Sequence, residues 1–148
     1  DQLIPLSREL ALCQRYLAIE ALRLGDRLKL EWQIEEGLEH QAIPPLTLQP
    51  LVENAIYHGI QPRPDGGTVR IEAQAKGEFV YLLVQNPKPD QNKQQHDGNR
   101  MALANIQSRL RALFGEPAVL KHSHQHDVYT VTLRLPRRKA GEQRARKQ

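Results

Sequence analysis

A chain of 148 residues is the usual size of one folded domain, and it is long enough to bury a hydrophobic core without staples. Hydrophobic residues make up 39% of it and charged residues 26%, with 10 Pro and 9 Gly, which excludes collagen-like, purely coiled-coil and wholly disordered chains. The single cysteine, Cys13, excludes an internal disulfide and a cysteine-rich metal site, and it favours a reducing compartment.

The net charge of +4 is concentrated at the C-terminal end of the chain. Residues 137–148 contain six basic side chains against Glu142, so the rest of the chain is close to neutral. This segment has no apolar side chain larger than alanine, so we expect a disordered basic tail in solvent rather than a contact with nucleic acid or acidic lipid. The chain has no long apolar run and no signal-peptide layout, which predicts a soluble, intracellular fragment.

The first half of the chain predicts two helices around one strand. Apolar residues at steps of three, four and seven predict a helix over residues 3–27. Strict alternation over residues 28–34 predicts a strand with one face on a core. Apolar residues at helical spacing then predict a second helix through residues 48–56, with Thr47 as its N-cap.

The second half predicts two hairpins separated by a loop and a helix. The strands of these hairpins are expected over residues 68–75 with 79–85, and over residues 118–121 with 128–135. Residues 86–99 are polar and contain two prolines, which predicts a long loop of a kind that is usually functional or disordered. Residues 101–114 show helical periodicity, and Gly115 ends that helix.

This order of elements predicts a layered α/β fold. Hairpins imply antiparallel pairs, and helices with one apolar stripe pack on a single face of a sheet. We therefore expect a two-layer sandwich in which a mixed, mainly antiparallel sheet carries the helices on one face.

Three polar residues, Glu53, Asn54 and His58, lie at the edges of the apolar stripe of the second helix. With about 100° per residue, Asn54 and His58 lie roughly 40° apart on one flank, and Glu53 lies on the other. An amide oxygen and a carboxylate can hold Mg²⁺ directly or through water, and an imidazole can donate to a phosphate oxygen. From spacing alone, ordinary polar residues at the edge of a stripe are the simpler interpretation.

Residues 44–59 read Pro-Pro-Leu-Thr-Leu-Gln-Pro-Leu-Val-Glu-Asn-Ala-Ile-Tyr-His-Gly, and this stretch resembles the N box of LytS-type sensor histidine kinases. That family has the GHKL (Bergerat) ATP-binding fold. Residues 16–24 resemble the family segment that leads into this box, and residues 104–115 resemble the helix after the ATP lid. The resemblance covers about residues 7–136.

The resemblance implies three parts of the chain and a set of roles. Residues 1–27 would be a lead-in helix, residues 28–136 the ATP-binding catalytic domain, and residues 137–148 the tail. Asn54 would ligate Mg²⁺ and, with Glu53, act as a polar catalytic residue near the phosphates of ATP. The nucleotide-binding positions would be Asn54 again, together with His58, Asn86, Gly98, Arg100, Leu103 and Asn105. Residues 87–99 would form the lid.

Some positions depart from the family pattern. Asn86 and Pro87 stand where the family usually has an acidic residue followed by glycines, and residues 98–103 keep one glycine of a glycine-rich pattern. Val128 and Tyr129 stand where the family has Gly-Thr. These departures leave an alternative open: a degenerate GHKL domain that binds ATP weakly or not at all and acts as a docking or regulatory module.

The resemblance also implies partners that lie outside this chain. The phospho-accepting histidine would lie on an upstream helix of the same protein, which would be a homodimer in the inner membrane with this domain in the cytoplasm. The phosphoryl group would pass to a LytTR-type response regulator. No nucleic acid is expected as a partner.

Three histidines, His122, His124 and His126, alternate along the chain and would share one face of a strand. Such a face could hold Zn²⁺ or Ni²⁺. However, Asp127 is the one further ligand type nearby, and residues 123–127 also fit the turn of the last hairpin. We therefore expect exposed histidines and no metal at this position.

Overall fold

The computed structural model describes residues 3–88 and 93–141, and for residues 93–98 it describes the backbone alone. The helices are α1 (Leu6–Leu24), α2 (Leu48–Asn54) and α3 (Lys93–Phe114), and the strands are β1 (Ile4–Pro5), β2 (Leu28–Ile34), β3 (Ala42–Ile43), β4 (Gly67–Lys76), β5 (Phe79–Pro87), β6 (Val119–Gln125) and β7 (Val128–Pro136). A 3-10 turn, Gly25–Arg27, follows α1, and a π-helical segment, Ala55–Ile60, continues α2.

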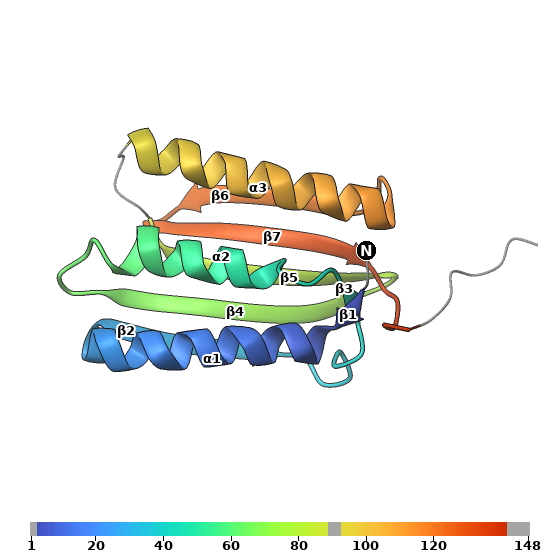
Figure 1. The fold of residues 1–148 in the computed structure, drawn as a ribbon, viewed down its shortest axis with the longest axis horizontal. Coiled ribbons are helices and arrows are strands. Elements are labelled where there is room, and N and C mark those ends of the chain that lie inside the picture. The colour runs from blue at the N-terminus through green and yellow to red at the C-terminus, as the bar shows by residue number, and fades with distance from the viewer. Residues whose placement is uncertain (1–2, 89–92, 142–148) are drawn as a thin grey trace, which may run out of the picture.

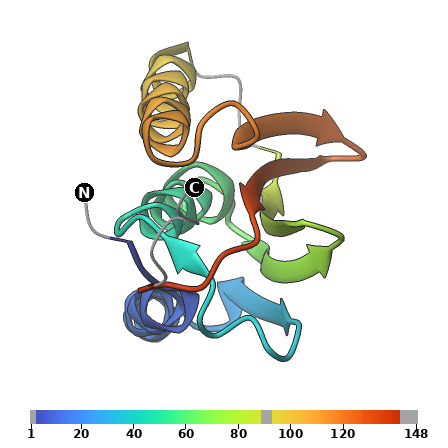
Figure 2. The same cartoon turned by 90° about the vertical axis from the view of Figure 1, so that its right-hand side faces the viewer.

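The main sheet has five strands in the order β2-β4-β5-β7-β6. β2 pairs with β4 in parallel, and the other three pairs are antiparallel. The three helices cover one face of this sheet, and α2 lies between α1 and α3 (Figures 1 and 2). The predicted two-layer α/β sandwich, with its mixed and mainly antiparallel sheet, is confirmed.

Alternation of side chains along the strands builds the core between the two layers. In β4, β5 and β7, every second side chain is buried, as the period-two geometry of a strand requires. The helices contribute their apolar stripes, and in α1 the fully buried members are Leu6, Cys13 and Leu17. These residues belong to one continuous core, so α1 is an integral part of the domain.

The expected loop over residues 86–99 is wrong at both ends. β5 continues through Pro87, which pairs with Val128, and α3 begins at Lys93. The implied lid over residues 87–99 is therefore strand at its first residue and helix from residue 93 on, and residues 89–92 lie outside the described part of the chain. Residues 93–97 carry no apolar side chain and so give no helical periodicity, but Lys and Gln have good helix propensity and extend the amphipathic helix behind them.

Thr47 does not cap α2 as expected. Its backbone is already helical and its hydroxyl donates to the Pro44 carbonyl oxygen at 2.7 Å. The first N–H groups of α2 donate instead to the buried carboxylate of Glu9 on α1. A carboxylate from a neighbouring helix thus satisfies the donors that a local cap would otherwise satisfy.

The last hairpin is confirmed, but its turn is tighter than the sequence suggests. β6 runs through Gln125, so the turn consists of His126 and Asp127 alone, with φ of 51° and 65°. Residues 123–125, which were expected in the turn, pair with β7. The ladder between β6 and β7 therefore extends further along β6 than the polar residues of its second half indicate, and its partner β7 is rich in β-branched residues.

Backbone bonding continues past β7, so the expected disordered tail over residues 137–148 is wrong for residues 137–140. The Ala42 N–H donates to the Arg138 carbonyl oxygen at 2.7 Å, and the Ala140 N–H donates to that of His40 at 2.6 Å. Lys139 forms an antiparallel bridge with Gln41. Residues 142–148 lie outside the described range.

None of the helices in the described ranges offers a stretch that is both long and apolar enough to span a lipid bilayer.

Candidate functional site

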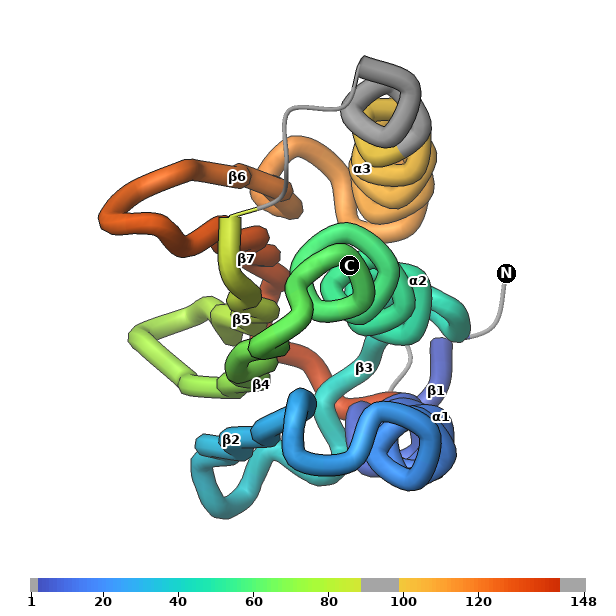
Figure 3. The backbone as a smooth tube through the Cα atoms, turned by 90° about the vertical axis from the view of Figure 1, so that its left-hand side faces the viewer, coloured from blue at the N-terminus to red at the C-terminus, as the bar shows by residue number. Residues whose placement is uncertain are grey.

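The residues expected to carry function gather around the end of α2. This helix buries Leu48, Leu51 and Val52 and ends at Asn54, and its backbone lies between α1 and α3 (Figure 3). The chain then continues as the π-helical segment, in which the Gln61 N–H donates to the Ile56 carbonyl oxygen at 2.8 Å. Single π-helical turns of this kind occur often at functional sites. The expected helix therefore exists, but its last turn is wider than spacing alone predicts.

Asn54 is half-buried and faces α3. Its amide nitrogen donates to Asn99 Oδ1 at 3.4 Å, and Asn99 Nδ2 donates to the hydroxyl oxygen of Tyr129 at 2.9 Å. These three side chains come from α2, α3 and β7, so they join three elements at one place. Burial raises the pKa of Tyr129, against a smaller lowering by the bond from Asn99. The phenol is therefore neutral and serves as an acceptor here.

Glu53 lies on the other side of α2, towards α1. It is exposed, and Gln49 Nε2 donates to its Oε2 at 3.2 Å. Its charge acts on Tyr16 of α1. The pKa of Tyr16 is raised to about 12, mainly by burial and to a smaller extent by the charges of Glu20 and Glu53. Glu53 and Asn54 thus project from opposite flanks of the helix, as the spacing predicts, and they do not share a single set of neighbours.

Asn86 packs against the π-helical segment. It is 4% exposed, and its amide nitrogen donates to the Pro87 carbonyl oxygen at 2.7 Å. A Cβ placed on Gly59 would lie 2.5 Å from that nitrogen, so glycine is required for this close approach. His58, the neighbour of Gly59, is half-buried and its ring meets that of Tyr57 edge-on at 4.8 Å. The end of α2 therefore brings Asn54, His58 and Asn86 into one region.

The remaining expected positions lie along α3. Gly98 falls in the first turns of this helix. Arg100 and Asn105 are exposed, whereas Leu103 is 5% exposed and belongs to the hydrophobic core. Within this group, the residue that meets Asn54 is Asn99, which the sequence places in the lid without a role of its own. A polar residue one turn before the buried Leu103 is the signal that could have identified it.

A second residue that the sequence analysis did not single out is Glu9. It lies three residues after Leu6 and four before Cys13, on the apolar stripe of α1, and it is fully buried. A charged residue on a buried stripe is unusual, because an unpaired charge there is costly. That anomaly in the pattern is the signal by which sequence alone could have marked it.

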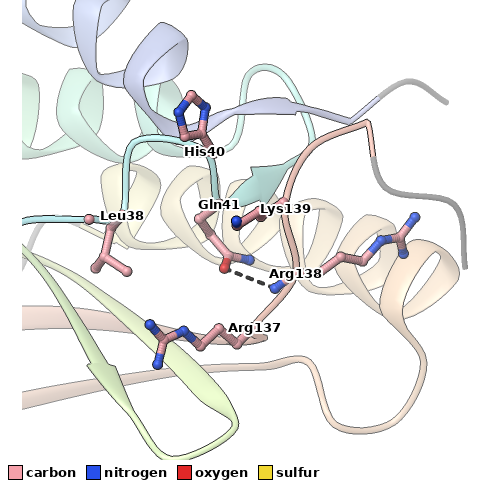
Figure 4. A pocket seen from close by; sticks show the side chains of 7 residues that line it. Leu38, His40, Gln41, Arg137, Arg138 and Lys139 are labelled. Carbon is pink, nitrogen blue, oxygen red and sulfur yellow. Dashed lines mark hydrogen bonds between the residues drawn. The ribbon is translucent and has the colours of Figure 1, made fainter. Parts of the chain in front are cut away.

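A small pocket of about 180 Å³ at the other end of the molecule is lined by Gly37, Leu38, His40, Gln41 and residues 137–139. Its rim is basic, but Figure 4 shows Arg137 and Arg138 pointing in opposite directions, and the Arg138 guanidinium lies 6.0 Å from the centre of the Phe114 ring. The Arg138 backbone N–H donates to Gln41 Oε1 at 3.1 Å. The cationic groups diverge, so this pocket does not form a cradle for an anion.

The alternating histidines do not converge either. His122 and His124 lie on the edge strand β6, where their rings are 5.9 and 4.6 Å from that of Tyr129. Among the residues that the structure describes, no three His, Cys, Asp or Glu side chains gather closely enough to hold a metal ion.

Comparison with known proteins gives two kinds of match, while no protein-family model matches the chain. The sensor histidine kinase YpdA of Escherichia coli is 37% identical over 124 residues, covering 78% of this chain and 22% of YpdA. The sensor protein LytS of Bacillus subtilis is 34% identical over 160 residues, covering 97% of this chain and 26% of LytS. The chain therefore spans about a quarter of the length of these curated relatives.

Solved structures match the fold. The isolated catalytic domain of the histidine kinase ThkA superposes with a TM-score of 0.67 at 8% identity, covering 92% of this chain and 97% of that domain. A structure of ThkA in complex with the response regulator TrrA superposes over 93% of this chain and 42% of the kinase, with a TM-score of 0.66 at 8% identity. By sequence, this chain is a homologue of the sensor histidine kinases that include LytS, and it has the fold of a histidine kinase catalytic domain.

Proposed function

We propose that this chain is the ATP-binding catalytic domain of a two-component sensor histidine kinase. In this proposal it binds MgATP and transfers the γ-phosphoryl group to a histidine outside the chain, for relay to a response regulator. The observation that carries the proposal is the position of Asn54, half-buried at the end of α2 beside α3, in a chain whose relatives are sensor kinases.

The residues at the end of α2 fit a magnesium nucleotide. Asn54 offers an amide oxygen, a ligand type that suits Mg²⁺, and His58 offers a ring N–H to a phosphate oxygen. Bound Mg²⁺ would neutralise charge on the phosphates, and such catalysis rests on positioning rather than on a covalent nucleophile. Glu53 would act beside the phosphates, while Asn86, Gly98, Arg100, Leu103 and Asn105 would complete the nucleotide site.

The partners follow from the same proposal. ThkA binds the response regulator TrrA, and we propose a LytTR-type regulator for this chain. The phospho-accepting histidine would lie on an upstream helix of the same protein, a homodimer of the inner membrane with this domain in the cytoplasm. For the biological setting we propose alginate regulation, because the chain resembles the sensor AlgZ (FimS). Phosphotransfer from the dimeric full-length protein to purified LytTR-type regulators tests these partners together.

Calorimetric titration of MgATP into the 148-residue chain tests the proposal. We expect saturable binding, and we expect Asn54→Ala to weaken it by about 10- to 100-fold, because loss of a group that holds the metal has effects of this size. Gln74→Ala, which removes an exposed amide on β4, is the matched control and should bind as the unchanged chain does. Binding that persists in full in Asn54→Ala, with and without Mg²⁺, would contradict the role of Asn54.

The second candidate is a domain that keeps the fold and has lost ATP. One observation favours it: Asn86 is buried, and its amide nitrogen already donates to the Pro87 carbonyl oxygen. This side chain is therefore less available to the adenine of ATP than an exposed carboxylate would be. The same titration separates the two functions. Absence of saturation below about millimolar MgATP would favour the docking or regulatory module.

A further inference from the structure

Glu9 of α1 uses its whole carboxylate to hold the backbone that enters α2. Its Oε1 accepts the Leu46 N–H at 3.1 Å. Its Oε2 accepts the N–H groups of Thr47 at 2.8 Å, Leu48 at 2.9 Å and Gln49 at 3.2 Å. Four successive donors on one buried carboxylate form an unusually complete set, and bonds to an ionised group are stronger than neutral ones.

The backbone that Glu9 holds is under strain. Leu46 has φ of 59°, a left-handed conformation that a large non-glycine side chain rarely adopts. Arg109 of α3 contacts the same junction: its guanidinium donates to the Leu46 carbonyl oxygen at 2.6 Å and to Thr47 Oγ1 at 3.1 Å. The junction before α2 is therefore fixed from α1 by a carboxylate and from α3 by a guanidinium.

The geometry of α2 passes this constraint on to the site. The helix has seven residues, so Asn54 lies only about 9 Å along the axis from Leu48, the first helical residue whose N–H Glu9 accepts. No side chain within α2's own N-terminal turn serves as its cap, since Thr47 bonds to Pro44 instead. A change at Glu9 would therefore alter the N-terminus of a short helix, α2, whose last two residues are Glu53 and Asn54.

We propose that Glu9 is a positioning residue for the nucleotide site: by holding residues 46–49, it sets where α2 presents Asn54. This inference rests on the proposed function, because positioning matters for MgATP only if MgATP binds. It also links α1 to the site, so that a displacement of α1 along its axis would move Asn54.

The test compares Glu9→Gln with the unchanged 148-residue chain. Glutamine keeps the shape but has one acceptor oxygen and an NH₂ that donates, so it cannot accept all four N–H groups. We expect MgATP binding, measured by calorimetry, to weaken about tenfold or more, as is typical when a group that orients a ligand residue is lost. Leu120→Ala on β6, the edge strand on the other side of the sheet from β2, controls for general loss of stability.

A second readout does not depend on the nucleotide. Amide hydrogen exchange over residues 48–60 should be faster in Glu9→Gln than in Leu120→Ala at equal distance from each variant's unfolding midpoint. If the unchanged chain fails to bind MgATP, the proposed function fails, and this exchange measurement alone decides whether Glu9 positions α2. Unchanged exchange over residues 48–60, or MgATP affinity equal to that of the unchanged chain, overturns the inference.

Should Glu9→Gln fail to fold, Glu9→Asp takes its place. It keeps the charge but shortens the side chain by one methylene, so its carboxylate cannot reach all four donors in their present positions. A folded Glu9→Asp with weakened MgATP binding and faster exchange over residues 48–60 supports the proposal, and one that behaves as the unchanged chain contradicts it.

Discussion

At the scale of single residues, the buried polar side chains Glu9, Gln41, Thr47 and Asn86 all bond to backbone groups. Glu9 accepts four N–H groups, Thr47 donates to Pro44, and Asn86 donates to Pro87. Gln41 accepts the Arg138 N–H and donates to the carbonyl oxygens of Ala42 and Pro136. Such bonds are worth most where their loss leaves a buried group unsatisfied. Each of these residues therefore fixes a segment of chain.

Gly59→Ala tests the contact between the π-helical segment and β5. The new Cβ would lie 2.5 Å from Asn86 Nδ2 and 2.9 Å from Asn86 Cβ, so one of the two segments must move. We expect the free energy of unfolding to fall by about 1–3 kcal/mol, the usual cost of overpacking. Urea denaturation measures it. The double variant Gly59→Ala, Asn86→Ala should recover part of the loss, and purely additive losses would argue against this contact.

We expect the Cys13 thiol to be unreactive and the free energy of unfolding to depend on its titration at alkaline pH. Burial, then the charges of Glu9 and Glu53, raise its pKa from 9.0 to about 12. The folded state therefore keeps the thiol proton that the unfolded chain loses, so this contribution is intact below about pH 9 and is lost as the pH rises towards 12. The unfolding free energy of Cys13→Ala should fall less steeply over this range. Rapid alkylation of native Cys13 at pH 8 would contradict the burial.

At the scale of elements, the fold was predictable where residue type and periodicity agree. The strand over residues 28–34, the β4–β5 hairpin and β7 follow from alternation, because one face of each of these strands is turned to the core. The edge strand β6 has no buried face, and it was predicted only as far as Lys121. The start of α3 was not predictable, since residues 93–97 have no apolar stripe. The widened turn after Asn54 packs against Asn86, a contact between segments distant in sequence. Likewise, Asn54 was singled out by its motif, whereas Glu9 and Asn99 stand out only by their contacts between elements that are distant in sequence.

The β6–β7 turn offers a prediction at this scale. His126 and Asp127 both have positive φ, which is the two-residue hairpin turn that Asn-Gly fits best. We expect the pair His126→Asn, Asp127→Gly to raise the free energy of unfolding by about 0.5–1 kcal/mol in thermal denaturation. Asp127→Val should lower it by about 1–2 kcal/mol, because a β-branched side chain is strained in this conformation. Equal stability of the two variants would show that the turn geometry is not limiting.

At the scale of the whole molecule, the segment after β7 closes the end of the domain away from Asn54. Residues 137–140 bond to Glu78 and to residues 40–42, so they tie β5's hairpin to the long connection after β2. Figure 1 shows this segment at the end of the molecule where α1 and α2 begin. The expected nucleotide site lies at the other end, so the two regions can be altered separately.

Truncation tests the contribution of this segment. Deleting residues 137–148 would leave the Ala42 N–H and Gln41 Oε1 without their partners from Arg138, and Gln41 is 4% exposed. We expect a loss of about 1–3 kcal/mol in the free energy of unfolding by urea, the cost of stranding buried polar groups. Deleting residues 142–148 alone keeps these bonds and is the matched control. Equal stability of the two truncated chains would refute the structural role of residues 137–141.

The parallel pairing of β2 with β4 has a consequence for the order of events in folding. The β4–β5 and β6–β7 hairpins join neighbours in sequence, whereas two pairings close long excursions: β2 finds β4 across residues 35–66, which include α2, and β5 finds β7 across residues 88–127, which include α3. Closing these excursions costs chain entropy before any ladder bond is gained, so these steps should limit the rate. Stopped-flow refolding of Val69→Ala, which faces Leu30 of β2, should then be slowed more than that of Leu120→Ala in the β6–β7 hairpin. If so, α2, which bears Asn54, and α3, which bears Asn99, acquire their neighbours last, and a partly folded chain has its hairpins before Asn54 meets Asn99.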